Sequence, residues 1–125
     1  VLHENYHILN GHLDTYFPSE NVDDDTDKRK FRIGNCFRTG ERAEQVAEKM
    51  RLLLRLEQLH DMLCPDYEPY CNDHYTPKSA VHFDREKYRM VSTCTYSEKS
   101  VYEVYFDSFE TADKVAAILN REVVK

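Results

Sequence analysis

The chain repeats one short pattern, and this repetition constrains its fold more than any other feature. The first copy reads Phe37-x-Thr39-x-Glu41-x-Ala43-x-x-Val46-Ala47-x-x-Met50, and the second reads Phe106-x-Ser108-x-Glu110-x-Ala112-x-x-Val115-Ala116-x-x-Leu119. In each copy a hydroxyl residue can cap a helix, a carboxylate lies in the first turn where the helix dipole favours it, and apolar residues follow at helical spacing. The pattern therefore predicts two related units in which a strand leads into a helix.

The length of the chain, 125 residues, is typical of one domain and allows a hydrophobic core without disulfides or metals. The longest apolar runs are short, and neither a membrane span nor a secretion leader is recognisable. We therefore expect a single domain, residues 1–125, in the cytoplasm. In that compartment the four cysteines are expected to be reduced thiols, namely Cys36, Cys64, Cys71 and Cys94.

An N-terminal β-hairpin is predicted from the dipeptide Asn10-Gly11. Apolar and aromatic residues lie on both sides of it, over residues 6–9 and 13–17. Asn-Gly favours a two-residue hairpin turn, because both central residues of that turn must reach positive φ. The sequence thus predicts a tight turn between two short strands.

A long helix is predicted to begin after Thr39 and to end at about Leu63, before Pro65. A polar loop over residues 18–27 and a short strand over residues 30–36 precede it. The helix carries two apolar stripes on roughly opposite sides. The first consists of Ala43, Val46, Ala47, Met50, Leu53 and Leu54, and the second consists of Leu52, Leu56, Leu59 and Leu63.

One sheet can cover only one of these stripes. The second is therefore covered either by another part of this chain or by a second subunit. Burial within the chain is the first expectation. The alternative is that the four leucines of the second stripe form an interface in a homodimer or with a partner, where their burial would contribute on the order of several kcal/mol before association costs.

The second half of the chain is predicted to form a β-meander and a shorter helix. Strands are expected over residues 81–84, 88–96 and 101–106, and the helix over residues 109–120. One face of the second strand is expected to carry Tyr88, Met90, Cys94 and Tyr96. The helix stripe, which consists of Ala112, Val115, Ala116 and Leu119, mirrors the first stripe of the long helix.

Together these elements predict an α+β fold built from two related strand-to-helix units. An antiparallel sheet is expected, with one long and one short helix packed on it. We divide the domain into residues 1–64, an irregular connector over residues 65–78, and residues 79–125.

Charged residues are segregated near the N-terminus, although the net charge of the whole chain is −6. Acidic residues come first, at Glu4, Asp14, Glu20, Asp23, Asp24, Asp25 and Asp27. A basic strip follows, consisting of Lys28, Arg29, Lys30, Arg32 and Arg38. An acidic protein surface disfavours nonspecific contact with nucleic acid, whereas a local basic strip can still bind phosphate. A solvated acidic loop beside a basic strand is the simplest interpretation.

A Cys2His2 metal site is the sharpest chemical hypothesis. His60 and Cys64 lie one turn apart on the predicted helix, and Cys71 and His74 follow in the connector. Thiolate and imidazole suit tetrahedral zinc, which would pin an irregular segment. The spacing matches no common zinc finger, however, and an ordinary helix end explains His60 and Cys64 equally well. We therefore expect no cofactor and keep zinc as the alternative.

Two other chemical sites are weaker. Asp23, Asp25 and Asp27 alternate as at the start of a calcium loop, but Lys28 replaces the required glycine and no glutamate closes the loop. Cys36 precedes a helix N-terminus, where a thiol can become a nucleophile. No histidine is placed by the sequence to act as its base, so a buried thiol is expected.

The segment from Asp27 to Thr39, followed by a charged amphipathic helix, resembles a segment common in small uncharacterised proteins encoded by bacteriophages and prophages of Gram-positive bacteria. The resemblance covers residues 27–63, with a weaker echo over residues 105–119. Many of those proteins also carry an aromatic hairpin before the segment and a strand and helix after it. The connector around Cys71 and the acidity of the N-terminal region depart from the group, and no catalytic residues are carried over.

The resemblance implies an accessory or counter-defence factor, for example an anti-CRISPR protein that binds a host nuclease. We therefore expect a noncatalytic protein that binds and inhibits a nucleic-acid-processing complex in the cytoplasm of a bacterial host. Spaced carboxylates can mimic the phosphates that a basic groove binds. The expected contact residues are Glu20, Asp23, Asp24, Asp25, Asp27, Tyr67 and Tyr70.

The alternative function is a small nucleic-acid-binding regulatory module. It would use the basic strip, with Tyr88 and Tyr102 stacking on bases. The absence of an RNP-type motif weakens this alternative. An enzyme that uses Cys36 or the Cys/His set is the third possibility, and we do not expect catalysis because no acid, base and binding loop converge by spacing.

Overall fold

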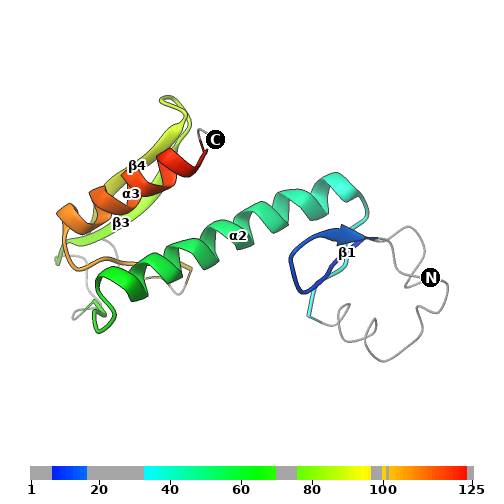
Figure 1. The fold of residues 1–125 in the computed structure, drawn as a ribbon, viewed down its shortest axis with the longest axis horizontal. Coiled ribbons are helices and arrows are strands. Elements are labelled where there is room, and N and C mark those ends of the chain that lie inside the picture. The colour runs from blue at the N-terminus through cyan, green and yellow to red at the C-terminus, as the bar shows by residue number, and fades with distance from the viewer. Residues whose placement is uncertain (1–6, 17–32, 70–75, 97–99, 101, 124–125) are drawn as a thin grey trace. The chain divides into compact units, whose positions relative to one another are not determined.

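The computed structural model describes residues 7–16, 33–69, 76–96, 100 and 102–123. Their elements, in chain order, are β1 (Ile8–Leu9), β2 (Thr15–Tyr16), α2 (Gly40–Leu63), β3 (Lys78–Asp84), β4 (Arg89–Thr95) and α3 (Phe109–Val123) (Figure 1). This confirms the α+β fold with one long and one short helix.

The chain groups into two compact units, and the division falls within α2. Unit 1 is Val1–Leu53 and unit 2 is Leu54–Lys125. The sequence predicted a single domain with an irregular connector over residues 65–78. The described parts of that connector contain no helix or strand until β3 begins at Lys78. Each unit is described by itself below.

Unit 1 begins with the predicted hairpin, in which β1 and β2 pair antiparallel. Its turn differs from the prediction. The Asn10 carbonyl accepts a bond from the Leu13 N–H at 3.0 Å, and the Asn10 N–H donates to the Asp14 carbonyl at 3.0 Å. The positive φ, 63°, falls on Leu13 and not on Asn10 or Gly11. The turn is therefore a longer loop with a left-handed residue at its end.

The segment before α2 extends this hairpin without a regular strand. Phe37 exchanges two main-chain hydrogen bonds with His7, at 2.6 and 2.8 Å. The side chain of Asn35 bonds both the N–H and the carbonyl of Leu9, at 2.7 and 2.8 Å. The strand predicted over residues 30–36 is thus wrong over 33–36, because Gly34 has a φ of 87° and turns the chain. Residues 30–32 lie outside the described part.

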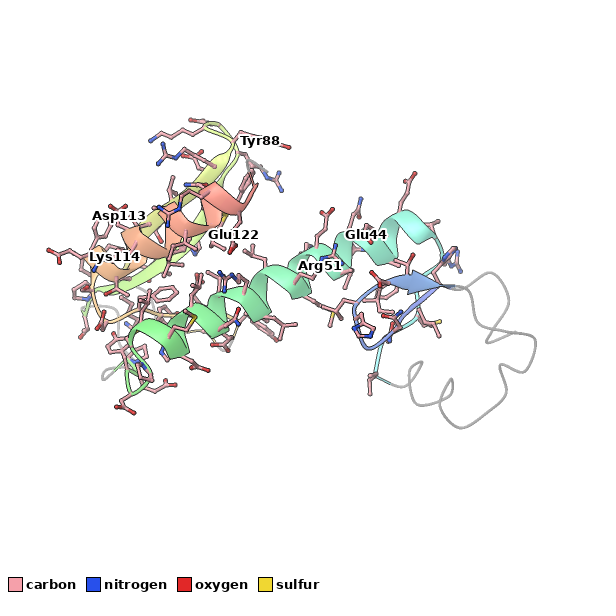
Figure 2. All side chains as sticks on the ribbon, in the orientation of Figure 1. Glu44, Arg51, Tyr88, Asp113, Lys114 and Glu122 are labelled. Atoms are coloured by element: carbon pink, nitrogen blue, oxygen red, sulfur yellow. The ribbon has the colours of Figure 1, made fainter. Side chains whose placement is uncertain are left out.

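The core of unit 1 is small. Leu9, Ala43 and Ala47 are buried together, and Leu13 and Phe37 pack against them. Alanine on this face of α2 allows the hairpin to approach the helix closely. Arg51 of α2 fixes the contact from outside, because its guanidinium donates to the Leu13 carbonyl at 3.1 Å and pairs with Glu44 at 2.5 Å (Figure 2).

Unit 2 is built on a longer hairpin. β3 and β4 pair antiparallel over seven residues each, from Lys78 opposite Thr95 to Asp84 opposite Arg89. The Asp84 carboxylate accepts two main-chain N–H groups within the turn. Tyr88 lies in that turn with a φ of 54°, and not in the strand.

The predicted apolar face of the second strand is therefore only partly correct. Met90 is buried, whereas Tyr88, Cys94 and Tyr96 are exposed. This face was predicted because apolar residues alternate with period two along the segment, and Tyr88 was counted as part of the strand. Because Tyr88 leaves the extended conformation, its side chain does not follow the strand alternation.

The third predicted strand, over residues 101–106, is not formed among the described residues 102–106. Phe106 makes one bridge, in which its N–H donates to the Ser79 carbonyl at 2.9 Å. The hydrogen bond between His82 and Glu103 continues the same antiparallel register through side chains. The predicted single sheet is accordingly two separate two-stranded ladders in the described part of the chain.

The core of unit 2 lies between the β3–β4 hairpin, α3 and the end of α2. The buried stripe of α3 is the one predicted, Ala112, Val115, Ala116 and Leu119. Leu59 of α2 enters the same core, with 1% of its surface exposed, and Leu56 packs beside it. Arg55 binds Glu122 of α3 through bonds of 2.6 and 2.8 Å. Part of the second leucine stripe is thus covered by its own chain.

The two copies of the repeated pattern have the same local structure. In each, a hairpin is bridged by the phenylalanine of the pattern, and a helix follows. Thr39 accepts the Arg42 N–H at 3.1 Å, and Ser108 accepts the Thr111 N–H at 3.1 Å, so both predicted helix caps are formed. The repeat is therefore a repeat of tertiary structure as well as of sequence.

Candidate protein-binding surface

The first apolar stripe of α2 continues beyond the core of unit 1. Ala43 and Ala47 are buried on this face, but Met50, Leu53 and Leu54 have 41%, 41% and 60% of their surface exposed. Helical periodicity places all five residues on one side of α2. We call Met50, Leu53 and Leu54 the α2 stripe.

In the second copy of the repeat, the residue equivalent to Met50 is covered. Leu119 holds the position in the pattern that Met50 holds in the first copy, and only 4% of Leu119 is exposed. In unit 2 the hairpin strands have seven residues, whereas those of unit 1 have two. The short hairpin reaches Ala43 and Ala47 but does not cover Met50.

Exposed charged side chains lie near the α2 stripe. Lys49 and Glu57 are exposed on the same helix, and Arg51 pairs with Glu44. An apolar surface with a charged rim is typical of a protein-binding site. Complete burial of three large apolar side chains would contribute on the order of several kcal/mol to binding before association costs.

The sequence predicted that these three side chains belong to the covered stripe, and that the opposite leucines are buried within the chain or, as the alternative, form an interface. Leu59 and Leu56 instead pack within unit 2, whereas Leu52 and Leu63 are exposed, so an interface through those two stays a prediction. The helix length was the signal that could have corrected the assignment. A helix of 24 residues is about 36 Å long, and two short strands cannot cover it.

Most predicted partner-binding residues lie outside the described part of the chain. These are Glu20, Asp23, Asp24, Asp25, Asp27 and Tyr70, together with Lys28, Arg29, Lys30 and Arg32 of the basic strip. Arg38 is described and exposed. Tyr67 is half-buried against the core of unit 2, where burial and the Asp107 carboxylate raise the pKa of its hydroxyl.

The zinc hypothesis rests on two described residues, because Cys71 and His74 lie outside the described part. The Nε2 atom of His60 donates to the Tyr67 carbonyl at 2.9 Å, and its Nδ1 atom lies 3.1 Å from Asp61. Burial raises the pKa of Cys64. Both features disfavour metal binding, which needs a free imidazole lone pair and a thiolate. Among the described side chains no group of three or more metal ligands is assembled.

The structure also describes the candidate nucleophile and the two candidate base-stacking tyrosines. Cys36 is half-buried, and burial raises the pKa of its thiol, which disfavours a nucleophilic thiolate. Tyr88 and Tyr102 are both exposed. Tyr88, in the turn, contacts Phe83 of β3 edge-to-face, with 5.3 Å between the ring centroids. It is therefore not part of a flat aromatic platform on the sheet.

Comparison with protein-family models, with curated proteins and with solved structures finds no match to this chain. Within the described residues, neither helix combines the length and the apolar character that a membrane span requires.

Proposed function

We propose that this chain is a noncatalytic binding protein that contacts a protein partner through the α2 stripe. The observation that carries the proposal is the exposure of Met50, Leu53 and Leu54 on one face of α2, where the residue equivalent to Met50 in the second copy of the repeat, Leu119, is buried. A noncatalytic role is supported by the raised thiol pKa values of Cys36 and Cys64 and by the hydrogen bonds that occupy both ring nitrogens of His60.

We place the partner among the nucleic-acid-processing complexes of a bacterial host, in its cytoplasm. The resemblance to phage-encoded proteins supports a counter-defence role of the anti-CRISPR kind. The net charge of −6 supports a basic partner. In this proposal the α2 stripe provides apolar contact, and the acidic residues between Glu20 and Asp27 provide electrostatic attraction by mimicry of phosphates.

The test is capture of the partner from a lysate of the bacterial host with the tagged full chain, followed by direct binding to the purified partner. The decisive variant is the double substitution Leu53→Glu and Leu54→Glu, which places charge on the stripe. Met62→Glu is the matched control, because Met62 is exposed on the same helix. We expect at least a tenfold loss of affinity for the double variant and unchanged affinity for the control. Equal affinity of the two variants would contradict a role of the α2 stripe.

A second set of variants tests the acidic contribution separately. Replacement of Asp23, Asp24, Asp25 and Asp27 by Asn should weaken partner binding and flatten its salt dependence. Unchanged binding would contradict phosphate mimicry but would not contradict the role of the α2 stripe. Capture of nucleic acid in place of a protein would instead favour the alternative module that uses Lys28, Arg29, Lys30, Arg32 and Arg38.

A further inference from the structure

The outer edge of the β3–β4 hairpin in unit 2 can be assigned residue by residue. The Asn120 side chain bonds both the N–H and the carbonyl of Met90, at 2.7 and 2.9 Å. The main-chain groups of Met90 therefore point away from β3. In an antiparallel pair this orientation alternates along the strand, so those of Ser92 and Cys94 also point outward.

The opposite edge of the hairpin supports this assignment independently. The Ser79 carbonyl accepts the Phe106 N–H and hence points away from β4. Ser79 is opposite Cys94 in the ladder. Facing residues of an antiparallel pair point their main-chain groups either both inward or both outward, so Cys94 points outward as well.

Ser92 and Cys94 thus present two N–H and two carbonyl groups on the outer edge of β4. Among the described residues no main-chain or side-chain group bonds these four groups. The Ser92 hydroxyl is used differently, because it donates to the Asp113 carboxylate of α3 at 3.1 Å. An edge with free main-chain groups is a template for an additional strand.

A cavity lies along this same edge. Its volume is about 310 Å³, and it is lined by Arg89, Met90, Val91 and Ser92 of β4 and by Asp113, Ala116 and Ala117 of α3. Figure 2 labels Asp113 on α3, which runs beside β4. The volume is at the lower end of the range for ligand sites, and the two alanines leave room for an aliphatic side chain.

We propose that this edge binds an extended peptide segment of a partner as an additional β-strand. The main chain of the peptide pairs with Ser92 and Cys94, and one aliphatic side chain enters the cavity beside Ala117. Pairing ends at Met90, because Asn120 already occupies its main-chain groups. This site is separate from the α2 stripe and goes beyond the function proposed above.

A second copy of the chain fits this edge less well than a peptide. Antiparallel pairing of two β4 strands about Ser92 would bring the two Asp113 carboxylates towards each other, and like charges repel. In such a pair, the second copy would also present the side chains of its Ser92 and Cys94 to the cavity, and these are too small to fill it. A peptide with a leucine or valine fills it without either cost.

The test uses the full chain, kept reduced, and a labelled octapeptide in which threonine alternates with leucine and valine between terminal lysines. Binding is followed by fluorescence anisotropy and by amide chemical shifts. We expect saturable binding with shifts centred on Ser92 and Cys94. The same peptide with every leucine, valine and threonine amide N-methylated should bind at least tenfold more weakly, because it lacks main-chain donors on both of its edges.

Two protein variants separate the edge from the cavity. Ser92→Pro removes an outward N–H and should abolish binding, whereas Ser92→Ala keeps it and should bind. Ala117→Phe fills the cavity and should weaken binding at least tenfold, with Lys114→Phe on the same helix as control. If Ser92→Pro does not fold, Ala117→Phe still tests the proposal, because it changes the cavity and not the strand.

Three outcomes would overturn the proposal. One is the absence of saturable binding by the unmethylated peptide. Another is equal binding of the methylated peptide, which would show that main-chain pairing is not involved. The third is a dimer in sedimentation that Ser92→Pro disrupts, which would assign the edge to a second copy. None of these outcomes bears on the α2 stripe, so the two proposals fail separately.

Discussion

Two asparagine side chains take the place of strand partners in this protein. Asn35 bonds both main-chain groups of Leu9 in unit 1, and Asn120 bonds both main-chain groups of Met90 in unit 2. A side-chain amide offers one acceptor and two donors, so it can satisfy an N–H and a carbonyl on the same residue. Each asparagine thus closes a strand position that regular pairing leaves open.

Replacement of Asn120 by Leu tests this role. The substitution leaves the N–H and the carbonyl of Met90 without partners in a partly buried position. We expect the free energy of unfolding of unit 2 to fall by about 1–3 kcal/mol and the Met90 amide to exchange faster with solvent. The Leu9 amide in unit 1 is the internal control and should keep its exchange rate. A Met90 rate equal to that of the wild type would show that the Asn120 bonds are not maintained in solution.

The environment of His60 determines how its contribution to the free energy of unfolding changes with pH. Burial lowers the pKa of His60, but the hydrogen bonds to Asp61 and to the Tyr67 carbonyl raise it more, so the pKa lies above the ordinary value. A folded-state pKa above the unfolded value means that folding takes up a proton. The resulting stabilisation is complete below the unfolded pKa and is lost as pH rises through the folded pKa.

We therefore expect the free energy of unfolding to fall as pH rises from about 6.5, the unfolded value, through the folded pKa of His60. The His60→Gln variant should lack this fall, because glutamine can still donate to the Tyr67 carbonyl but does not titrate. Urea unfolding at several pH values measures the difference, and NMR titration of the His60 ring measures the pKa directly. A His60 pKa at or below 6.5 would contradict the arrangement.

At the scale of elements, the helices could be predicted from the sequence because their ends carry local signals. Thr39 and Ser108 cap the two helix starts, and Pro65 follows the end of α2. These signals act within a few residues along the chain. Both helices therefore begin where the sequence predicted, and α3 extends three residues beyond the predicted end at Asn120.

The strands were harder to predict because their limits depend on distant partners. The segment that ends at Phe106 has strand-like composition, yet it makes only one bridge to Ser79 in the described part of the chain. In the hairpin of unit 1, the Asn-Gly signal gave the correct position but not the loop length, which left Leu13 in the left-handed region. The limits of the α2 stripe follow from these strand lengths, so the sequence alone did not reveal the candidate site.

Two leucines of α2 make a matched test of how the helix is covered. Leu59 is buried in the core of unit 2, whereas Leu54 is 60% exposed. Leu59→Ala should lower the free energy of unfolding by about 2–5 kcal/mol, because it leaves a cavity. Leu54→Ala should change it by no more than about 0.5 kcal/mol. Urea denaturation followed by circular dichroism measures both, and equal losses would show that the α2 stripe is covered in solution.

At the scale of the whole molecule, α2 takes part in both units while their cores remain distinct. The buried cluster of Leu9, Ala43 and Ala47 shares no residue with the cluster around Leu59 and Val115. Each unit contains its own hairpin, its own phenylalanine bridge and its own capped helix start. Local openings in proteins follow such cooperative units. The two units are therefore expected to open separately under native conditions.

The two helix caps allow this separation to be tested with one change in each unit. Thr39→Ala removes the cap of α2 and should lower the stability of unit 1 by about 1 kcal/mol, which accelerates exchange of the Ala47 amide and not that of Val115. Ser108→Ala should have the opposite pattern, because Val115 belongs to the helix that Ser108 caps. Native-state hydrogen exchange by NMR measures both amides in each variant. If either substitution accelerates both amides equally, the two cores open together and the chain behaves as one cooperative unit.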